Sequence, residues 1–188
     1  VVALYATFLN RAYDQLLMDV AMHRAPVTVV LDRAGITGAD GASHNGMWDI
    51  AMAAMIPGMR LAAPRDEATL RSQLRQAVAI DDGPSLVRYR KGSMPAPIEA
   101  LESLEGMDWL YRSHKQRAGK RVLLVAAGAM AEPMLAAAAQ LEALGYAPDV
   151  IYPCWLLPIN PALVELTRGY DLVVSAEDGL VDGGFGSA

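Results

Sequence analysis

An apolar strand pattern runs directly into a glycine-rich loop in the segment Val27-Thr-Val-Val-Leu-Asp-Arg-Ala-Gly-Ile-Thr-Gly-Ala-Asp-Gly-Ala-Ser-His-Asn-Gly46. Its first five residues are typical of a buried strand in a parallel sheet. Four glycines between residues 35 and 46 make the continuation too irregular for a helix or a strand. Ligands in open α/β sheets bind outside the carboxyl ends of the strands, so a polar loop at this place predicts a binding site. The alternative is an ordinary surface turn, since loops are commonly polar.

Three side chains suited to chemistry lie in or beside this loop: Arg33, Asp40 and His44. A lone histidine is more often structural than catalytic, but His44 lies between two polar residues of the loop rather than on an apolar face. Its imidazole can donate or accept a proton near neutral pH. His23 and His114 lack such a setting, and we interpret both as structural.

Composition limits the class of protein. The chain has 188 residues, of which 53% are hydrophobic, and this excludes a disordered chain. Its net charge of −5 offers no basic surface for nucleic acid. No apolar run approaches the roughly 20 residues of a membrane-spanning helix, so no membrane partner is expected. The single cysteine excludes an internal disulfide and fits a reducing compartment, which predicts a cytoplasmic protein.

Strand and helix patterns alternate along the chain. Strands are expected over 1–5, 27–31, 60–63, 85–89, 121–126, 149–152 and 171–176, with helices over 7–21, 48–55, 66–79, 128–144 and 160–168. This alternation predicts an α/β protein with mostly parallel sheets flanked by helices. We expect two units, 1–95 and 120–188, joined by a linker over 96–119 with a short strand near 107–111. Both ends of the sequence fall inside expected elements, so we expect a piece of a longer protein.

Charged and aromatic side chains gather where three expected strands end. Tyr5 ends the first strand, Arg33 follows the second, and Arg88 lies at the end of the fourth, with Arg90 and Lys91 behind it. Parallel strands bring their carboxyl ends to one edge of the sheet, so the first three side chains could converge on a single anion. A guanidinium suits phosphate because its planar fork donates two parallel hydrogen bonds. The alternative is a set of solvated arginines paired with nearby carboxylates. No cluster has metal-ligand spacing, so no metal ligand is predicted in this chain.

Four blocks of the sequence carry a resemblance to a known family. They are Tyr5-Ala-Thr-Phe-Leu-Asn-Arg-Ala-Tyr-Asp-Gln15, Asp32-Arg-Ala-Gly-Ile-Thr-Gly-Ala-Asp-Gly-Ala-Ser-His44, Asp82-Gly-Pro-Ser-Leu-Val-Arg-Tyr89 and Gly183-Gly-Phe-Gly-Ser187. Together they resemble the 1-deoxy-D-xylulose-5-phosphate synthases, a family of transketolase-like thiamine diphosphate enzymes. The resemblance spans nearly the whole chain. It implies the later part of a transketolase pyrimidine-binding domain followed by a truncated transketolase C-terminal domain.

The resemblance also implies an activity. Such a transferase decarboxylates pyruvate on thiamine diphosphate and joins the two-carbon unit to glyceraldehyde 3-phosphate. The product, 1-deoxy-D-xylulose 5-phosphate, enters isoprenoid and thiamine biosynthesis. A homodimer is implied for the full-length protein. The ligands of Mg²⁺, and the glutamate that protonates the pyrimidine, would lie outside this chain, so we expect the chain to be inactive alone.

Roles for individual residues follow from the resemblance. Phe8 would lie against the aminopyrimidine ring of the cofactor, with Arg11 beside it. His44 and Asp40 would be the catalytic residues. His44 would donate a hydrogen bond to the carboxylate of pyruvate or to the developing alkoxide, and Asp40 would bind a hydroxyl of the acceptor.

The resemblance assigns the acceptor's phosphate to Tyr5, Arg33 and Arg88. Two positions depart from the family's pattern: Arg90 stands where proline is expected, and Cys154 stands where arginine is usual. Two alternatives stay open, a transketolase-like enzyme with another sugar-phosphate acceptor and a transketolase-like module without catalytic activity.

Overall fold

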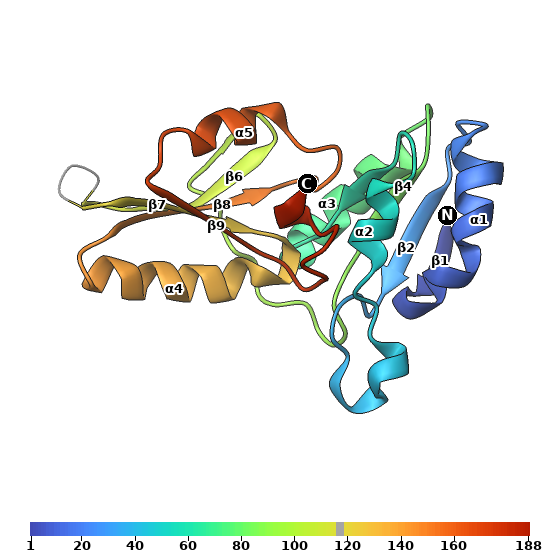
Figure 1. The fold of residues 1–188 in the computed structure, drawn as a ribbon, viewed down its shortest axis with the longest axis horizontal. Coiled ribbons are helices and arrows are strands. Elements are labelled where there is room, and N and C mark those ends of the chain that lie inside the picture. The colour runs from blue at the N-terminus through green and yellow to red at the C-terminus, as the bar shows by residue number, and fades with distance from the viewer. Residues whose placement is uncertain (116–118) are drawn as a thin grey trace.

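Two α/β units follow one another along the chain, each built on its own sheet (Figure 1). The computed structural model describes residues 1–115 and 119–188. The first sheet has the strand order β1-β2-β4-β3 and the second has the order β5-β6-β8-β7-β9. In Figure 1 the first unit lies at the right and the second at the left. The predicted fold class, two units with mostly parallel sheets flanked by helices, is confirmed.

All strands of the first sheet are parallel. They are β1 (Val2–Tyr5), β2 (Thr28–Asp32), β3 (Arg60–Ala62) and β4 (Ser85–Arg88). The register places Tyr5 beside Asp32, and Leu31 beside Arg88. The carboxyl ends of β1, β2 and β4 therefore share one edge of the sheet, as the sequence predicts.

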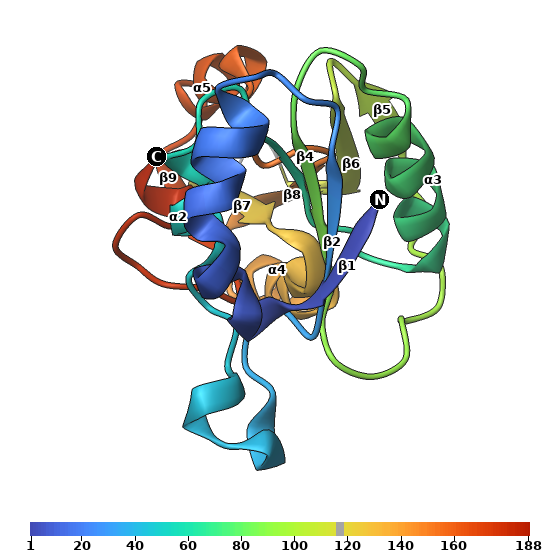
Figure 2. The ribbon, with the colours of Figure 1, turned by 90° about the vertical axis from the view of Figure 1, so that its right-hand side faces the viewer.

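Helices cover both faces of the first sheet. Figure 2 shows α3 (Glu67–Val78) on one side, and α1 (Tyr13–Gln15) and α2 (Asp49–Ala54) on the other. The helix α3 begins at a capping box, in which the Asp66 carboxylate accepts a hydrogen bond of 2.8 Å from the Thr69 amide. Such a cap satisfies amides that the first turn of a helix leaves without partners.

The helix expected over 7–21 is irregular. It consists of a 3₁₀ segment (Ala6–Ala12), the single α-turn α1 (Tyr13–Gln15) and a π segment (Leu16–Ala21). Threonine is a residue type that often caps a helix, but the Thr7 hydroxyl donates to the Ser43 carbonyl at 2.9 Å instead. The Thr7 side chain therefore makes a tertiary contact with the glycine loop and is not available to cap the start of the helix.

The second sheet mixes directions. Its strands are β5 (Glu102–Leu104), β6 (Met107–Arg112), β7 (Arg121–Ala126), β8 (Ala147–Pro153) and β9 (Leu172–Ala176). β7 is parallel to β8 and β9, whereas β6 is antiparallel to β8 and β5 is antiparallel to β6. In Figure 1 the helices α4 (Ala131–Ala143) and α5 (Pro161–Thr167) lie on opposite faces of this sheet.

The segment 96–119, expected as a linker, supplies two strands to the second sheet. β6 agrees with the short strand expected near 107–111, and β5 is an addition. Glu105 and Gly106 connect them, with φ angles of 52° and 77°. Positive φ at both central residues is the geometry of the tight hairpin turn that suits twisted strands. Residues 116–118 of the expected linker lie outside the described residues, and the domain boundaries themselves stay a prediction.

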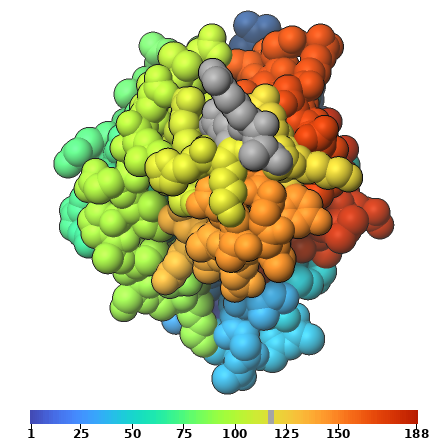
Figure 3. All heavy atoms as spheres, turned by 90° about the vertical axis from the view of Figure 1, so that its left-hand side faces the viewer, coloured from blue at the N-terminus to red at the C-terminus, as the bar shows by residue number. Residues whose placement is uncertain are grey.

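The two units share a hydrophobic core. Leu31 and Leu61 of the first unit and Leu123 and Ile151 of the second are fully buried in one cluster. The amide of Leu61 also donates to the carbonyl of Leu157 at 3.1 Å. The glycine loop, in contrast, projects from the shared body (Figures 1 and 2), and its light-blue atoms form the lower rim of the face in Figure 3.

Candidate functional site

Three aromatic rings meet where β1 ends. The ring centroid of Tyr5 lies 5.8 Å from that of Phe8 and 5.6 Å from that of His44. Phe8 and His44 are 6.2 Å apart in an edge-on arrangement. The bond from Thr7 to the Ser43 carbonyl ties the 3₁₀ segment to the loop, which brings His44 to the other two rings.

Phe8 is the exposed member of this aromatic group. Phe8 is 43% exposed, and the guanidinium carbon of Arg11 lies 5.3 Å from its ring centroid. The rings of Tyr5 and His44 contact Phe8, and part of its aromatic surface stays exposed. Such a surface fits a planar heteroaromatic group of a cofactor.

Asp40 joins the ends of three strands. Its carboxylate accepts a hydrogen bond from the Tyr5 hydroxyl at 2.9 Å and another from Lys91 Nζ at 2.6 Å. Nη1 of Arg33 lies 3.8 Å from the same carboxylate, and the guanidinium carbon lies 4.9 Å from the ring centroid of Tyr5. Lys91, and to a smaller extent Tyr5, hold the pKa of the Asp40 carboxyl below its usual value. Asp40 is therefore a carboxylate surrounded by donors at the predicted edge.

The glycine loop is held to the second unit by Asp178. Its carboxylate accepts hydrogen bonds from the Ile36 amide at 3.2 and 3.3 Å. The preceding residue, Gly35, has a φ of 84°, and a Cβ there would lie 2.0 Å from an Asp178 oxygen. Glycine is required at this position both for the backbone conformation and for the close approach.

Arg88 lies at the same sheet edge, but its side chain binds elsewhere. It is buried, its Nε donates to Asp49 on α2 at 2.6 Å, and its Nη2 donates to the Asp178 carbonyl at 2.8 Å. The structure thus joins Tyr5 and Arg33 directly through Asp40 and places Arg88 against α2 and the second unit. That Arg88 reaches the same ligand stays a prediction.

His44 has a hydrogen-bond partner next to it in the chain. Its Nδ1 lies 3.0 Å from the Ser43 hydroxyl oxygen. When Nδ1 accepts this bond, the ring carries its proton on Nε2, which is the arrangement of a neutral donor. The imidazole ring lies in the aromatic group, edge-on to the rings of both Tyr5 and Phe8.

Sequence reasoning missed three residues of this region. The sequence marks Lys91 only as a charge behind Arg88. Its position three residues past a strand end is the signal that could have placed it at the site. Asp49 and Asp178 gave no such signal, because their partners lie 39 and 142 residues away in the chain. Only the packing of the two units reveals their contacts.

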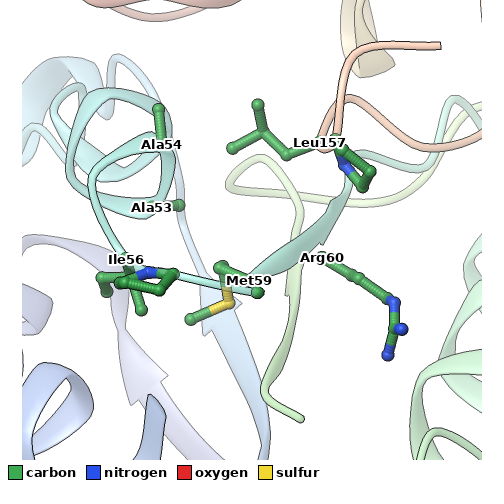
Figure 4. Close-up of a pocket in the computed structure, with 9 residues that line it drawn as sticks. Ala53, Ala54, Ile56, Met59, Arg60 and Leu157 are labelled. Atoms are coloured by element: carbon green, nitrogen blue, oxygen red, sulfur yellow. The ribbon is translucent and has the colours of Figure 1, made fainter. Parts of the chain in front are cut away.

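A cavity in the described part of the chain lies away from these residues. It has a volume of about 350 Å³ and opens between the end of α2, the start of β3 and Leu157 (Figure 4). It is lined mainly by apolar groups such as Ile56 and Met59, and Arg60 stands at its edge. Convergent polar and aromatic groups are the better mark of a site, so we place the candidate site at the glycine loop.

Residues 1–115 and 119–188 contain neither a metal-binding cluster nor a membrane-spanning helix. No group of three or more histidine, cysteine, aspartate or glutamate side chains is arranged to hold a metal ion there. No helix in that part of the chain is both long and apolar enough to cross a bilayer.

Solved structures resemble this fold. One, titled as a split-gene transketolase in the form of an inactive beta4 tetramer, superposes with a TM-score of 0.82 and is 31% identical. The match covers 98% of this chain and 59% of that one. A transketolase from Campylobacter jejuni superposes with a TM-score of 0.73 at 18% identity, over 93% of this chain and 30% of that one. The second likeness shows the fold alone.

Sequence comparisons agree with this likeness. The 1-deoxy-D-xylulose-5-phosphate synthases of Frankia casuarinae and Pseudarthrobacter chlorophenolicus are 54% and 55% identical over the whole chain. The chain spans only 29% of the length of each. The family described as "Transketolase, pyrimidine binding domain" matches residues 1–97, and the one described as "Transketolase, C-terminal domain" matches residues 112–188. The chain therefore belongs to the transketolase family.

Proposed function

We propose that this chain is part of a thiamine diphosphate-dependent transferase. It would convert pyruvate and glyceraldehyde 3-phosphate into 1-deoxy-D-xylulose 5-phosphate and CO₂, the first step of the methylerythritol phosphate route to isoprenoids. The observation that carries the proposal is the joining of Tyr5, Arg33 and Asp40 at the carboxyl edge of a parallel sheet. The names of two relatives that are 54% and 55% identical to this chain support the same reaction.

Phe8 and Arg11 would receive the cofactor's pyrimidine. The exposed ring of Phe8 offers the flat contact, and Arg11 stands beside that ring. The bound cofactor supplies the electron sink for loss of CO₂ from a 2-oxo acid. The diphosphate, Mg²⁺ and the pyrimidine-protonating glutamate would be held by residues outside this chain.

His44 and Asp40 would act on the reacting groups. With Nδ1 accepting from the Ser43 hydroxyl, His44 would donate a hydrogen bond from Nε2 to the carboxylate of pyruvate or to the oxygen that becomes negative when the acceptor aldehyde is attacked. Asp40 would accept a hydrogen bond from a hydroxyl of the acceptor. Donors from three strand ends already orient its carboxylate, so little reorganisation would be needed.

Tyr5, Arg33 and Arg88 would bind the acceptor's phosphate. Arg33 is half-exposed and stands over the Tyr5 ring, so both can reach a ligand at the edge. Arg88 uses Nε and one terminal nitrogen for Asp49 and the Asp178 carbonyl, and its second terminal nitrogen would serve the phosphate. Arginine suits this role because it stays charged and donates from a rigid fork.

The chain alone would be inactive, and the complete protein would be a cytoplasmic homodimer. Support for inactivity comes from the similar split-gene transketolase, whose solved β4 tetramer is described as inactive. Activity would require the remaining part of the protein, because the relatives are more than three times as long as this chain.

Product analysis tests the proposal. The full-length protein is incubated with pyruvate, glyceraldehyde 3-phosphate, thiamine diphosphate and Mg²⁺, and we expect equal amounts of CO₂ and 1-deoxy-D-xylulose 5-phosphate. Condensation only with a different sugar phosphate would replace the proposed acceptor. Absence of any CO₂ release from pyruvate would favour a non-catalytic module and contradict the proposal.

A further inference from the structure

A lysine outside the predicted site contacts its central carboxylate. Lys91 follows β4 by three residues, and its Nζ lies 2.6 Å from Asp40 Oδ1. The same Nζ lies 3.4 Å from the Thr37 carbonyl oxygen. The ammonium therefore binds the turn Gly38–Asp40 at both ends, once through backbone and once through the side chain.

This arrangement differs from an isolated surface ion pair. Long side chains that meet in water contribute little, because ordering them offsets the attraction. Here the carboxylate is shared with the Tyr5 hydroxyl and Arg33, and the Asp40 side chain is only 25% exposed. The three donors come from the ends of β1, β2 and β4, so they fix Asp40 from three directions.

Lys91 follows the end of β4, and its side chain reaches the glycine loop. Arg88, from the same strand, is buried against Asp49. The Lys91 side chain is 38% exposed, and its four-carbon stem allows it to span from the sheet edge to the loop. Tyr5, Arg33 and Lys91 are the groups with charge or a titratable proton that contact Asp40 in the described residues.

We propose that Lys91 is a positioning residue that holds Asp40 in the orientation needed to bind a hydroxyl of the acceptor substrate. This inference rests on the proposed function, because it gives Lys91 a role in recognition of a polyhydroxylated aldehyde phosphate. Lys91 acts through Asp40, so its effect concerns the second substrate and leaves the binding of pyruvate unchanged. The pKa of Asp40 is lowered, and Lys91 is the largest cause of that shift, which agrees with an action of Lys91 through Asp40.

The first experiment compares substrate requirements in the full-length protein. Lys91→Met should raise the KM for glyceraldehyde 3-phosphate about fivefold, the size expected for a half-exposed ion pair, and leave the KM for pyruvate unchanged. Lys91→Arg should restore most of the loss, since it keeps the cation. Lys115→Ala is the matched control, because Lys115 donates to the Glu142 carbonyl of the second unit. Equal increases for both substrates would overturn the inference.

A double-mutant cycle separates action through Asp40 from an independent role. In an Asp40→Asn background, Lys91→Met should add little to the loss, because the contact is already weakened. Additive losses would show that Lys91 acts on its own and would overturn the positioning role.

A third measurement does not depend on activity. The carboxyl pKa of Asp40, followed by NMR of ¹³C-labelled aspartate with Asp40→Asn for assignment, should rise in Lys91→Met and stay unchanged in Lys115→Ala. An unmoved pKa would remove the contact on which the inference stands. If the wild-type protein makes no 1-deoxy-D-xylulose 5-phosphate while the Asp40 pKa still rises in Lys91→Met, the contact stands, and the proposed function and the substrate role fail.

Discussion

Arg88 Nε donates to Asp49 Oδ2 at 2.6 Å, and the two side chains are only 6% and 1% exposed. This pair joins the end of β4 to the start of α2, and the Arg88 guanidinium continues to the Asp178 carbonyl of the second unit. The sequence predicts that Arg88 binds a ligand, and the structure shows that its side chain connects β4, α2 and the second unit. Substitution of its partner tests the structural role.

Asp49→Ala should destabilise the protein strongly. Removal of the carboxylate leaves a buried guanidinium without its counter-charge, and such losses are about 3–5 kcal/mol. Chemical unfolding of the full-length protein measures the change. Asp82→Asn is the control, since Asp82 pairs with Arg60 at the surface and its loss should leave the unfolding midpoint nearly unchanged. Similar midpoints for both variants would contradict a structural role for the buried pair.

Gly35→Ala should disrupt the glycine loop more than Gly41→Ala. Both glycines have φ near 85°, and Gly41 also has a ψ of 166°, so both substitutions carry a backbone strain of about 1–3 kcal/mol. Only at Gly35 would the new Cβ also meet the Asp178 carboxylate, while nothing lies within 4 Å of a Cβ at Gly41. The melting temperatures of the two variants measure the two losses. Adding Asp178→Ala to Gly35→Ala should recover part of the loss, and no recovery would show that the two residues do not collide.

Asp40 should make stability depend on pH in the acid range. Its pKa is lowered in the folded protein, so its contribution is present above the ordinary carboxyl pKa and is lost as pH falls through the lowered value. The melting temperature of the wild type should therefore approach that of Asp40→Asn as pH decreases below about 4. Parallel curves for the two proteins over that range would mean that the carboxylate gains nothing from Lys91 and Tyr5.

Sequence reasoning located the sheet edge because the relevant signals are local. The period of the apolar strands and their alternation with helices placed Tyr5 and Arg33 at neighbouring strand ends, and the register confirms that these ends share one edge. The partner of Arg88 was not readable, because Asp49 belongs to a helix whose packing depends on the whole unit. Burial of a charged side chain is a tertiary property that no local pattern encodes.

Two further differences have the same origin. Thr7 has the residue type of a helix cap, but its hydroxyl bonds to the Ser43 carbonyl, 36 residues away. The strand β5 is not predicted from the sequence because all of its residues are exposed, so it has no buried apolar side chains. Its tight turn also begins with Glu105, which has a positive φ that is unusual for glutamate. In each case a contact between distant segments overrides the preference that sequence shows locally.

The last prediction concerns the acceptor's phosphate. Arg33→Ala should raise the KM for glyceraldehyde 3-phosphate about tenfold, the lower range for loss of a hydrogen bond to a charged group, and change the KM for pyruvate little. Arg88→Ala should shift the same KM by a larger factor than that for pyruvate, but it should also lower the melting temperature, because Asp49 is left buried without its cation. Arg71→Ala, which removes a surface pair with Glu67, controls for charge alone. An equal effect of Arg33→Ala on both substrates would contradict the phosphate role, since pyruvate carries no phosphate for that guanidinium to bind.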